Sequence, residues 1–176
     1  MKKVLIIIFS VFLFWGCTEP VKEKPVVKPR IFPNYHVALD EIIRTQEGVI
    51  RGVNLNSKAE LIKKVETAQP QEAEADHLYF EYNLDSLCDY SVAYTLQKDS
   101  LEEINVQINC KDLDESSKIF IDLKDYYEKK LPNPTEDKGY VVYNCFEGQR
   151  KPFVVSLSDN STPTKGIISL VIYKDK

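Results

Sequence analysis

The segment CDYSVAYTLQKDSLEEINVQINC, residues 88–110, decides the fold. Apolar residues alternate with mostly polar ones in its first half and again in its second half. The apolar positions of the two alternating runs are Cys88, Tyr90, Val92, Tyr94 and Leu96, followed by Ile104, Val106, Ile108 and Cys110. A period of two is typical of β-strands that have one buried and one wetter face. Polar residues from Lys98 to Ser100 favour a hairpin turn between the runs. The segment therefore predicts two neighbouring antiparallel strands.

Further strands are predicted on both sides of this segment. A run from His77 to Leu84 precedes it, and the pair Asp85-Ser86 favours a turn before Cys88. Later strands are expected over residues 139–146, 152–157 and 166–173. The chain has 10 Tyr and 8 Phe but one Trp. This composition favours sheet-rich packing, because aromatic residues are common in strands.

Apolar residues at helical spacing predict three helices. The first lies within residues 35–45. The second follows the capping-box pattern of residues 57–60, and its apolar face is expected to contain Leu61, Ile62 and Val65. The third extends from Asp114 to Pro132, with apolar positions at Ile119, Phe120, Leu123, Tyr126, Tyr127 and Leu131.

The order helix–strand–strand–strand occurs twice, over residues 47–110 and 114–174. Each half alone leaves most of a sheet face uncovered. Placed side by side, the halves form one continuous antiparallel sheet with helices on one face. The predicted fold class is therefore α+β, in a single globular domain over residues 34–176.

The N-terminus has the pattern of an export signal. Lys2 and Lys3 precede the run from Val4 to Trp15, which is apolar except for Ser10. A helix that spans a bilayer needs about twenty apolar residues, so this run is too short to span one. Residues 1–16 are therefore predicted to be a signal peptide.

The sequence Leu13-Phe-Trp-Gly16-Cys17 resembles the bacterial lipobox, in which a small residue precedes a cysteine that is diacylated before cleavage. The resemblance implies lipidation of Cys17. Two or three acyl chains hold a protein stably on a membrane leaflet. Residues 17–33 contain Pro20, Pro25, Pro29 and Pro33, and such spacing favours an extended polyproline-II tether. We expect a lipid-anchored protein of the cell envelope, on the outer membrane.

The stretch Glu47-Gly-Val-Ile-Arg51-Gly52-Val-Asn-Leu55, followed by a short helix, is similar to the opening of the SmpA/OmlA module and of the β-lactamase-inhibitor-protein-like fold. It also resembles envelope lipoproteins of Bacteroidetes-type bacteria built on this plan. The resemblance covers roughly residues 47–110. It implies protein binding or outer-membrane scaffolding, and it brings no catalytic residues.

After lipidation of Cys17, the remaining cysteines are Cys88, Cys110 and Cys145, an odd number that permits at most one internal bridge. If residues 97–103 connect the hairpin, Leu96 faces Ile104. Cys88 and Cys110 then lie diagonally on one face, within plausible reach of a disulfide. Export permits oxidation, whereas buried free thiols are common in alternating strands. Cys145 is a candidate partner for either cysteine.

No nucleotide, metal or nucleophile motif is present. The only histidines are His36 and His77, and no pair of ligands has zinc-site spacing. The sequence therefore predicts no metal, no cofactor and no catalytic residue. The net charge of −4 gives no reason to bind nucleic acid.

Two triplets, Asp85-Ser86-Leu87 and Asp99-Ser100-Leu101, match the Asp-Ser/Thr-apolar pattern of O-glycosylation in Bacteroidetes-type envelope proteins. Both fall where turns are predicted, so Ser86 and Ser100 are candidate modification sites. If helices cover one sheet face, the other face is open to a partner. The predicted function is a non-enzymatic, membrane-anchored protein-binding module. The alternative is a lipoprotein that binds glycan, lipid or a small molecule.

Overall fold

The computed structural model of the 176-residue chain describes residues 29–131, 133–137, 139–145 and 152–175. The predicted signal peptide, the predicted lipidation site Cys17 and most of the predicted tether lie outside the described residues.

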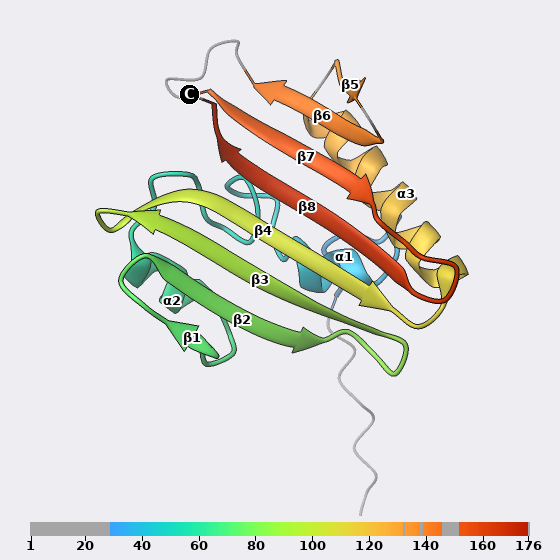
Figure 1. Ribbon diagram of the computed structural model, residues 1–176, viewed down its shortest axis with the longest axis horizontal. Coiled ribbons are helices and arrows are strands. Elements are labelled where there is room, and N and C mark those ends of the chain that lie inside the picture. The colour runs from blue at the N-terminus through green and yellow to red at the C-terminus, as the bar shows by residue number, and fades with distance from the viewer. Residues whose placement is uncertain (1–28, 132, 138, 146–151, 176) are drawn as a thin grey trace, which may run out of the picture.

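The described residues form one antiparallel sheet of eight strands in the order β1-β2-β3-β4-β8-β7-β6-β5 (Figure 1). In chain order the strands are β1 (Glu72–Ala73), β2 (His77–Asn83), β3 (Cys88–Gln97), β4 (Ser100–Cys110), β5 (Thr135–Asp137), β6 (Tyr140–Cys145), β7 (Phe153–Asp159) and β8 (Gly166–Lys174). The six longer strands were predicted. The edge strands β1 and β5 were not, because two or three residues are too few to show alternation.

Three helices pack on the sheet: α1 (Ala38–Ile42), α2 (Ala59–Val65) and α3 (Leu113–Lys130). Figure 1 shows all three behind the sheet, on the same side. The predicted α+β class, with an antiparallel sheet and helices on it, is confirmed.

The hairpin between β3 and β4 is tighter than predicted. Gln97 pairs with Ser100, so the turn is only Lys98 and Asp99, both with positive φ. Two such residues fit a turn whose twist matches that of the strands. The register then shifts between Thr95 and Leu96. Leu96 therefore pairs with Leu101 and not with Ile104 as predicted, because a two-residue turn and a bulge replaced the expected longer connection.

The start of α2 also differs from the capping-box prediction. Lys58 occupies the N-cap position and makes no side-chain cap hydrogen bond. The Ser57 hydroxyl instead accepts from the Asn54 backbone N–H, and the Ala59 N–H donates to Asp99. Leu61 is 41% exposed, so the predicted apolar face of α2 is narrower than expected and has only Ile62 fully buried. The nearby hairpin turn has taken over the capping role.

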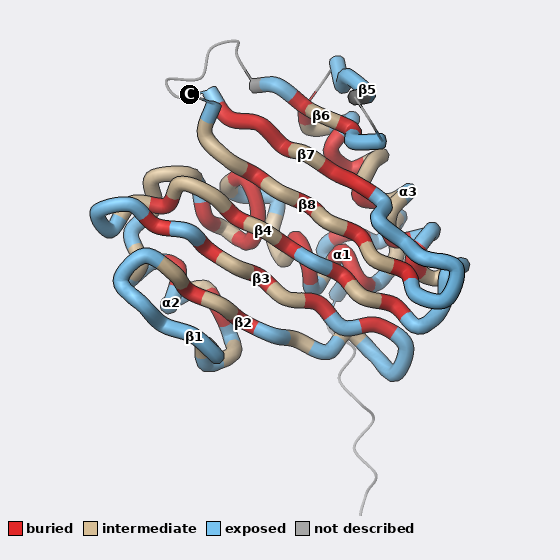
Figure 2. Tube along the Cα trace, in the orientation of Figure 1, coloured by how far each residue is buried: buried red, intermediate tan, exposed pale blue. Residues whose placement is uncertain are grey.

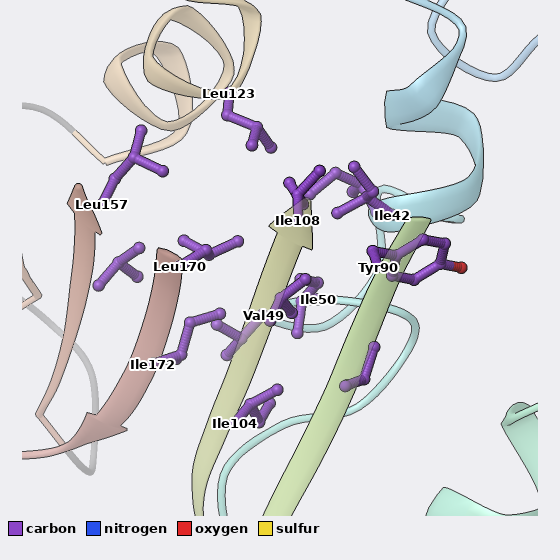
Figure 3. Packing of buried hydrophobic residues seen from close by; sticks show 14 of the residues in the cluster. Ile42, Val49, Ile50, Tyr90, Ile104, Ile108, Leu123, Leu157, Leu170 and Ile172 are labelled. Carbon is purple, nitrogen blue, oxygen red and sulfur yellow. The ribbon is translucent and has the colours of Figure 1, made fainter. Parts of the chain in front are cut away.

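The long helix α3 begins where Asp112 caps it. The Asp112 carboxylate accepts from the backbone N–H groups of Asp114 and Glu115. Predicted apolar positions on this helix are buried, including Ile119, Leu123 and Tyr127. Figure 3 shows Leu123 pointing toward the side chains of β4, β7 and β8. The core thus lies between the helices and one sheet face.

The N-terminal end of the described chain packs on this core. Phe32 is 4% exposed, and its ring meets the Tyr126 ring edge-on at 5.5 Å. Arg30 donates to the Asp40 carboxylate, at 2.7 Å between Nε and Oδ2. Residues 30–33, assigned to the tether from sequence, are therefore attached to the domain in the structure.

Helix α3 lies so close to the start of β8 that only glycine fits there. A Cβ atom on Gly166 would lie 2.3 Å from the Ser116 Cβ. We expect Gly166→Ala to lower the free energy of unfolding by about 1–3 kcal/mol through overpacking. Urea denaturation measures the change, with Ser169→Ala on the same strand as the control.

Adding Ser116→Gly to Gly166→Ala removes the clashing atoms, so the double variant is expected to recover part of the loss. Ser116→Gly alone costs about 1 kcal/mol because glycine is a poor helix residue. Strictly additive losses would contradict the close approach of α3 to β8.

Candidate functional site

Two groups of polar residues are candidates for a functional site, one buried behind the sheet and one on its open face. The sealed group is centred on Arg51 and Glu66, whose side chains are both 0% exposed. Two nitrogens of Arg51 bond the two carboxylate oxygens of Glu66, at 2.8 Å from Nε and 2.5 Å from Nη2. Such a bidentate pair is a strong, geometrically specific interaction.

Several neighbours complete the bonding of this ion pair. Arg44 donates to Glu66 at 2.9 Å, and the hydroxyls of Tyr82 and Tyr94 also donate to it. Arg51 also donates to two backbone carbonyls at the end of α1 and to the Tyr90 hydroxyl. We name these six residues the Arg51 cluster: Arg44, Arg51, Glu66, Tyr82, Tyr90 and Tyr94.

Burial and ion pairing shift the pKa values of two residues of the Arg51 cluster, Glu66 and Tyr94, in opposite directions. Burial by itself would raise the pKa of the Glu66 carboxyl. The hydrogen bonds and the charge of Arg51 lower it by more than burial raises it, so the pKa lies below its usual range. Burial, together with the charge of Glu66, raises the pKa of Tyr94 well above normal. Each charge has a partner, and the side chains of Arg51 and Glu66 have no solvent access. The Arg51 cluster is therefore structural, joining α1, α2 and their connecting loop to β2 and β3.

The second polar group is the open face of the sheet. Residues paired across antiparallel strands share a face, and the pairing register gives one continuous row over six strands. This row consists of Glu81, Ser91, Gln107, Ser169, Ser158 and Tyr140. A neighbouring row contains Tyr79, Ala93, Asn105, Val171, Ser156 and Val142. Figure 2 shows buried positions alternating with less buried ones along β3, β4 and β8, whereas most positions of β7 are buried.

The part of this face over β2, β3 and β4 is hollowed. The hollow has a volume of about 570 Å³. We name it the β2–β4 hollow; its open-face residues are Tyr79, Glu81, Asn83, Asp89, Ser91, Ala93, Asn105, Gln107 and Asn109, and Gln71 lies at its rim. Ser91 and Ala93 lie in the middle strand of the three. Their short side chains leave the space that the larger residues surround.

Hydrogen bonds hold part of the β2–β4 hollow in place. Gln107 donates from Nε2 to Oδ1 of Asn109, at 3.2 Å, and Asn109 donates from Nδ2 to Oδ1 of Asp89, at 3.0 Å. The Tyr79 hydroxyl donates to Glu81 at 3.1 Å. These bonds fix the orientation of two amides and one aromatic ring before any ligand arrives.

The charge of the β2–β4 hollow is one-sided. Its described lining includes the carboxylates Glu81 and Asp89 and contains no Lys or Arg. Anions are therefore disfavoured at this site, whereas neutral and cationic groups are not.

The tyrosines of the strands divide between the two sides of the sheet. Tyr90 and Tyr94 are buried in the core, as predicted. Tyr143 is also buried, and its hydroxyl donates to the Lys124 carbonyl. Tyr79 lines the β2–β4 hollow. The alternation of residues along β2 predicts that Tyr79 lies on the face away from the core, but it does not predict that a hollow forms there.

Cys88 and Cys110 form a disulfide, with their Cα atoms 4.2 Å apart. They are direct cross-strand partners and not the diagonal neighbours expected from sequence, because the tight turn and bulge moved the register. The Lys111 N–H donates to the Leu87 carbonyl. The adjacent Cys88–Cys110 pair is therefore of the non-hydrogen-bonded kind, in which side chains approach closely. Of the alternatives that the sequence left open, the structure has the bridge between Cys88 and Cys110.

The candidate glycosylation sites lie at two turns. Ser86 is exposed in the β2–β3 turn, where Asp85 accepts from the N–H groups of Leu87 and Cys88. Ser100 is half-buried and begins β4, just after the turn in which it was expected. Modification of either serine stays a prediction.

Among the described residues, no three His, Cys, Asp or Glu side chains are grouped as metal ligands. In the same part of the chain, no helix is both long enough and apolar enough to cross a bilayer. Comparison with known proteins found no matching family model, no matching curated protein and no matching solved structure. The resemblance to SmpA/OmlA and β-lactamase-inhibitor-protein-like modules therefore stays a prediction.

The Arg51 cluster predicts a strong effect of Glu66→Gln. The substitution leaves the Arg51 charge buried and uncompensated, so the free energy of unfolding should fall by about 3–5 kcal/mol at neutral pH. Because the folded pKa of Glu66 is lowered, its contribution is present above the unfolded pKa and is lost as pH falls through the folded pKa. Glu66→Gln should therefore lose less stability than the wild type on acidification.

Chemical denaturation at neutral and acid pH measures both effects. Glu60→Gln, at an exposed position on the same helix, is the matched control and should behave as the wild type. Equal stability of Glu66→Gln and Glu60→Gln would contradict a stabilising role for the cluster.

The disulfide predicts a second stability change. The bonded cysteines are 22 residues apart, so the double variant Cys88→Ser, Cys110→Ser should lose roughly 3 kcal/mol, mainly through a less constrained unfolded chain. Denaturant curves with and without reductant measure the loss, and the double variant should not respond to reductant. Alkylation of both Cys88 and Cys110 in denatured, unreduced wild type, read by peptide mass spectrometry, would contradict the bond.

Proposed function

We propose that this protein is a lipid-anchored, non-enzymatic binding module of the cell envelope that engages its partner through the open face of its sheet. One observation carries the proposal. The helices cover one side of an eight-stranded sheet, while the other side presents polar and small apolar residues with a hollow of about 570 Å³ over β2, β3 and β4. Concave sites of about 300–1,000 Å³ with fixed polar groups are common places for small ligands to bind.

The location in the envelope is supported by two independent features. The sequence carries the signal pattern and the lipobox-like Cys17. The Cys88–Cys110 disulfide belongs to the chemistry of oxidising compartments outside the cytoplasm. We propose the outer membrane as the site of anchorage, through lipid at Cys17.

A non-enzymatic role is supported by where the perturbed groups lie. Strongly shifted pKa values mark active sites when they occur in a cleft. Here Glu66 and Tyr94 are sealed behind the sheet, and each is bonded to a partner. On the open face, the polar groups of the β2–β4 hollow are amides, hydroxyls and the carboxylates of Glu81 and Asp89.

We also propose that residues 47–110 and 114–174 are two related halves. The last strand of each predicted half, β4 and β8, pair with each other at the centre of the sheet. This arrangement supports the side-by-side placement expected from the sequence, and it creates one open face shared by both halves.

The anchor is tested by metabolic labelling with radioactive palmitate. Wild-type protein should take up label, and Cys17→Ser should take up none and leave the membrane fraction. The double variant Cys88→Ser, Cys110→Ser is the control for loss of cysteine and should be labelled. Equal labelling of wild type and Cys17→Ser would contradict the anchor.

The binding face is tested by photo-crosslinking in intact cells. A photoreactive residue at Gln107, which is exposed on the open face, should form covalent products with a partner. The same residue at Ile121, which is 59% exposed on α3, is the matched control and should form few. Products formed from position 121 and not from position 107 would place binding on the helical side and overturn the proposal.

A further inference from the structure

We infer that the β2–β4 hollow binds an uncharged carbohydrate, a short segment of a neutral glycan. The inference rests on the proposed function, because it names the ligand of the same open face. It depends on four properties of the hollow: its charge, its hydrogen-bonding groups, its aromatic wall and its floor.

The charge of the hollow restricts the ligand class. Glu81 and Asp89 lie in the lining, and no described lining residue is Lys or Arg. Phosphate groups, acidic lipid headgroups, nucleic acids and acidic polysaccharides would meet like charge without a compensating cation. A neutral polyol meets no such repulsion.

The hydrogen-bonding groups of the hollow match sugar hydroxyls. Each hydroxyl is both a donor and an acceptor, and each amide side chain offers both kinds of group. Asn83, Asn105, Asn109 and Gln107 supply four amides around one space. Within the described residues, the Asn105 amide and the Gln107 Oε1 make no hydrogen bond, so both are available to a ligand.

Part of this array is ordered in advance. The chain from Gln107 through Asn109 to Asp89 crosses from β4 to β3 with bonds of 3.2 and 3.0 Å. A ligand that binds fixed groups does not have to order them, and this ordering cost is a large part of what weakens binding of flexible polar surfaces. Asp89 retains a second carboxylate oxygen that can accept from hydroxyls in a charge-assisted bond.

An aromatic ring borders the same space. Tyr79 lines the hollow, and its hydroxyl bond to Glu81 restrains the ring. The Tyr79 ring also stacks near the His77 ring, with centroids 6.4 Å apart and planes 13° from parallel. The electron-rich face of an aromatic ring attracts polarised C–H groups, and pyranose rings present rows of them.

The floor of the hollow argues against a protein ligand at this spot. Stable protein interfaces depend on central aromatic or arginine anchors that fill pockets. Here the floor residues Ser91 and Ala93 are small and Asn105 is polar. The volume of about 570 Å³ lies within the range of small-ligand sites.

Calorimetric titration of the full-length, lipidated protein in detergent tests the inference. The probes are neutral oligosaccharides of glucan, mannan, xylan and galactan, with oligogalacturonate as the anionic counterpart. At least one neutral probe should bind with an affinity that hardly changes with added salt, since screening acts on charges. Oligogalacturonate should not bind.

Two variants locate the bound sugar. Gln107→Ala and Asn105→Ala should each weaken binding roughly three- to tenfold, the effect of losing one or two hydrogen bonds. Gln97→Ala is the matched control, because this exposed glutamine lies on β3 but outside the hollow, and should bind as wild type. Circular dichroism confirms that each variant is folded.

The outcomes separate this inference from the proposed function. Absence of binding across the neutral panel, preferential binding of oligogalacturonate, or unchanged binding by both variants overturns the carbohydrate assignment. If protein products still form from position 107 in cells, the open face remains the binding surface and its partner is a protein. If neither saccharide nor cross-linked partner is found at this face, both proposals fail.

Discussion

The buried ion pair between Arg51 and Glu66 is the interaction on which the arrangement of this domain depends. Arg51 is in the loop that follows α1, and Glu66 ends α2. Helices α1 and α2 are both too short to be stable alone. The pair bonds these segments to each other, to the carbonyls that end α1, and to tyrosines on β2 and β3. It thereby fixes the N-terminal third of the domain on one face of the sheet.

The same two strands connect this cluster with the proposed binding surface. Along β3, Tyr90 and Tyr94 point to the Arg51 cluster, while Asp89, Ser91 and Ala93 lie on the opposite face. Along β2, the Tyr82 hydroxyl donates to Glu66 of the cluster, whereas Tyr79 and Glu81 line the hollow. The disulfide joins the far end of β3 to β4. The floor of the hollow is therefore held from behind by the cluster and from one end by a covalent bond. A rigid floor suits a site whose polar groups must be in place before the ligand arrives.

The limits of prediction are clear in particular residues. The alternation of Tyr90, Val92 and Tyr94 predicted their burial correctly, because the pleat of a strand forces neighbours to opposite faces. The predicted register of the hairpin was wrong. Lys98 and Asp99 both adopt positive φ in a two-residue turn, and the turn contains no glycine that would have indicated this in the sequence. The role of Glu66 was also not predicted. A glutamate at the end of a short helix looks solvent-exposed, and only the approach of Arg51 from a separate loop accounts for its burial.

The amino-acid sequence by itself determined the α+β class, the six main strands, the long helix and which side of each central strand faces the core. These properties follow from the spacing of apolar residues along the chain, which depends only on residues that are close in sequence. Only the tertiary structure decided that β4 pairs with β8 at the centre of the sheet, that Cys88 faces Cys110, and that amides from β2 and β4 surround one hollow. These properties depend on the register between strands, and a turn that is shorter by one or two residues changes every pairing beyond it.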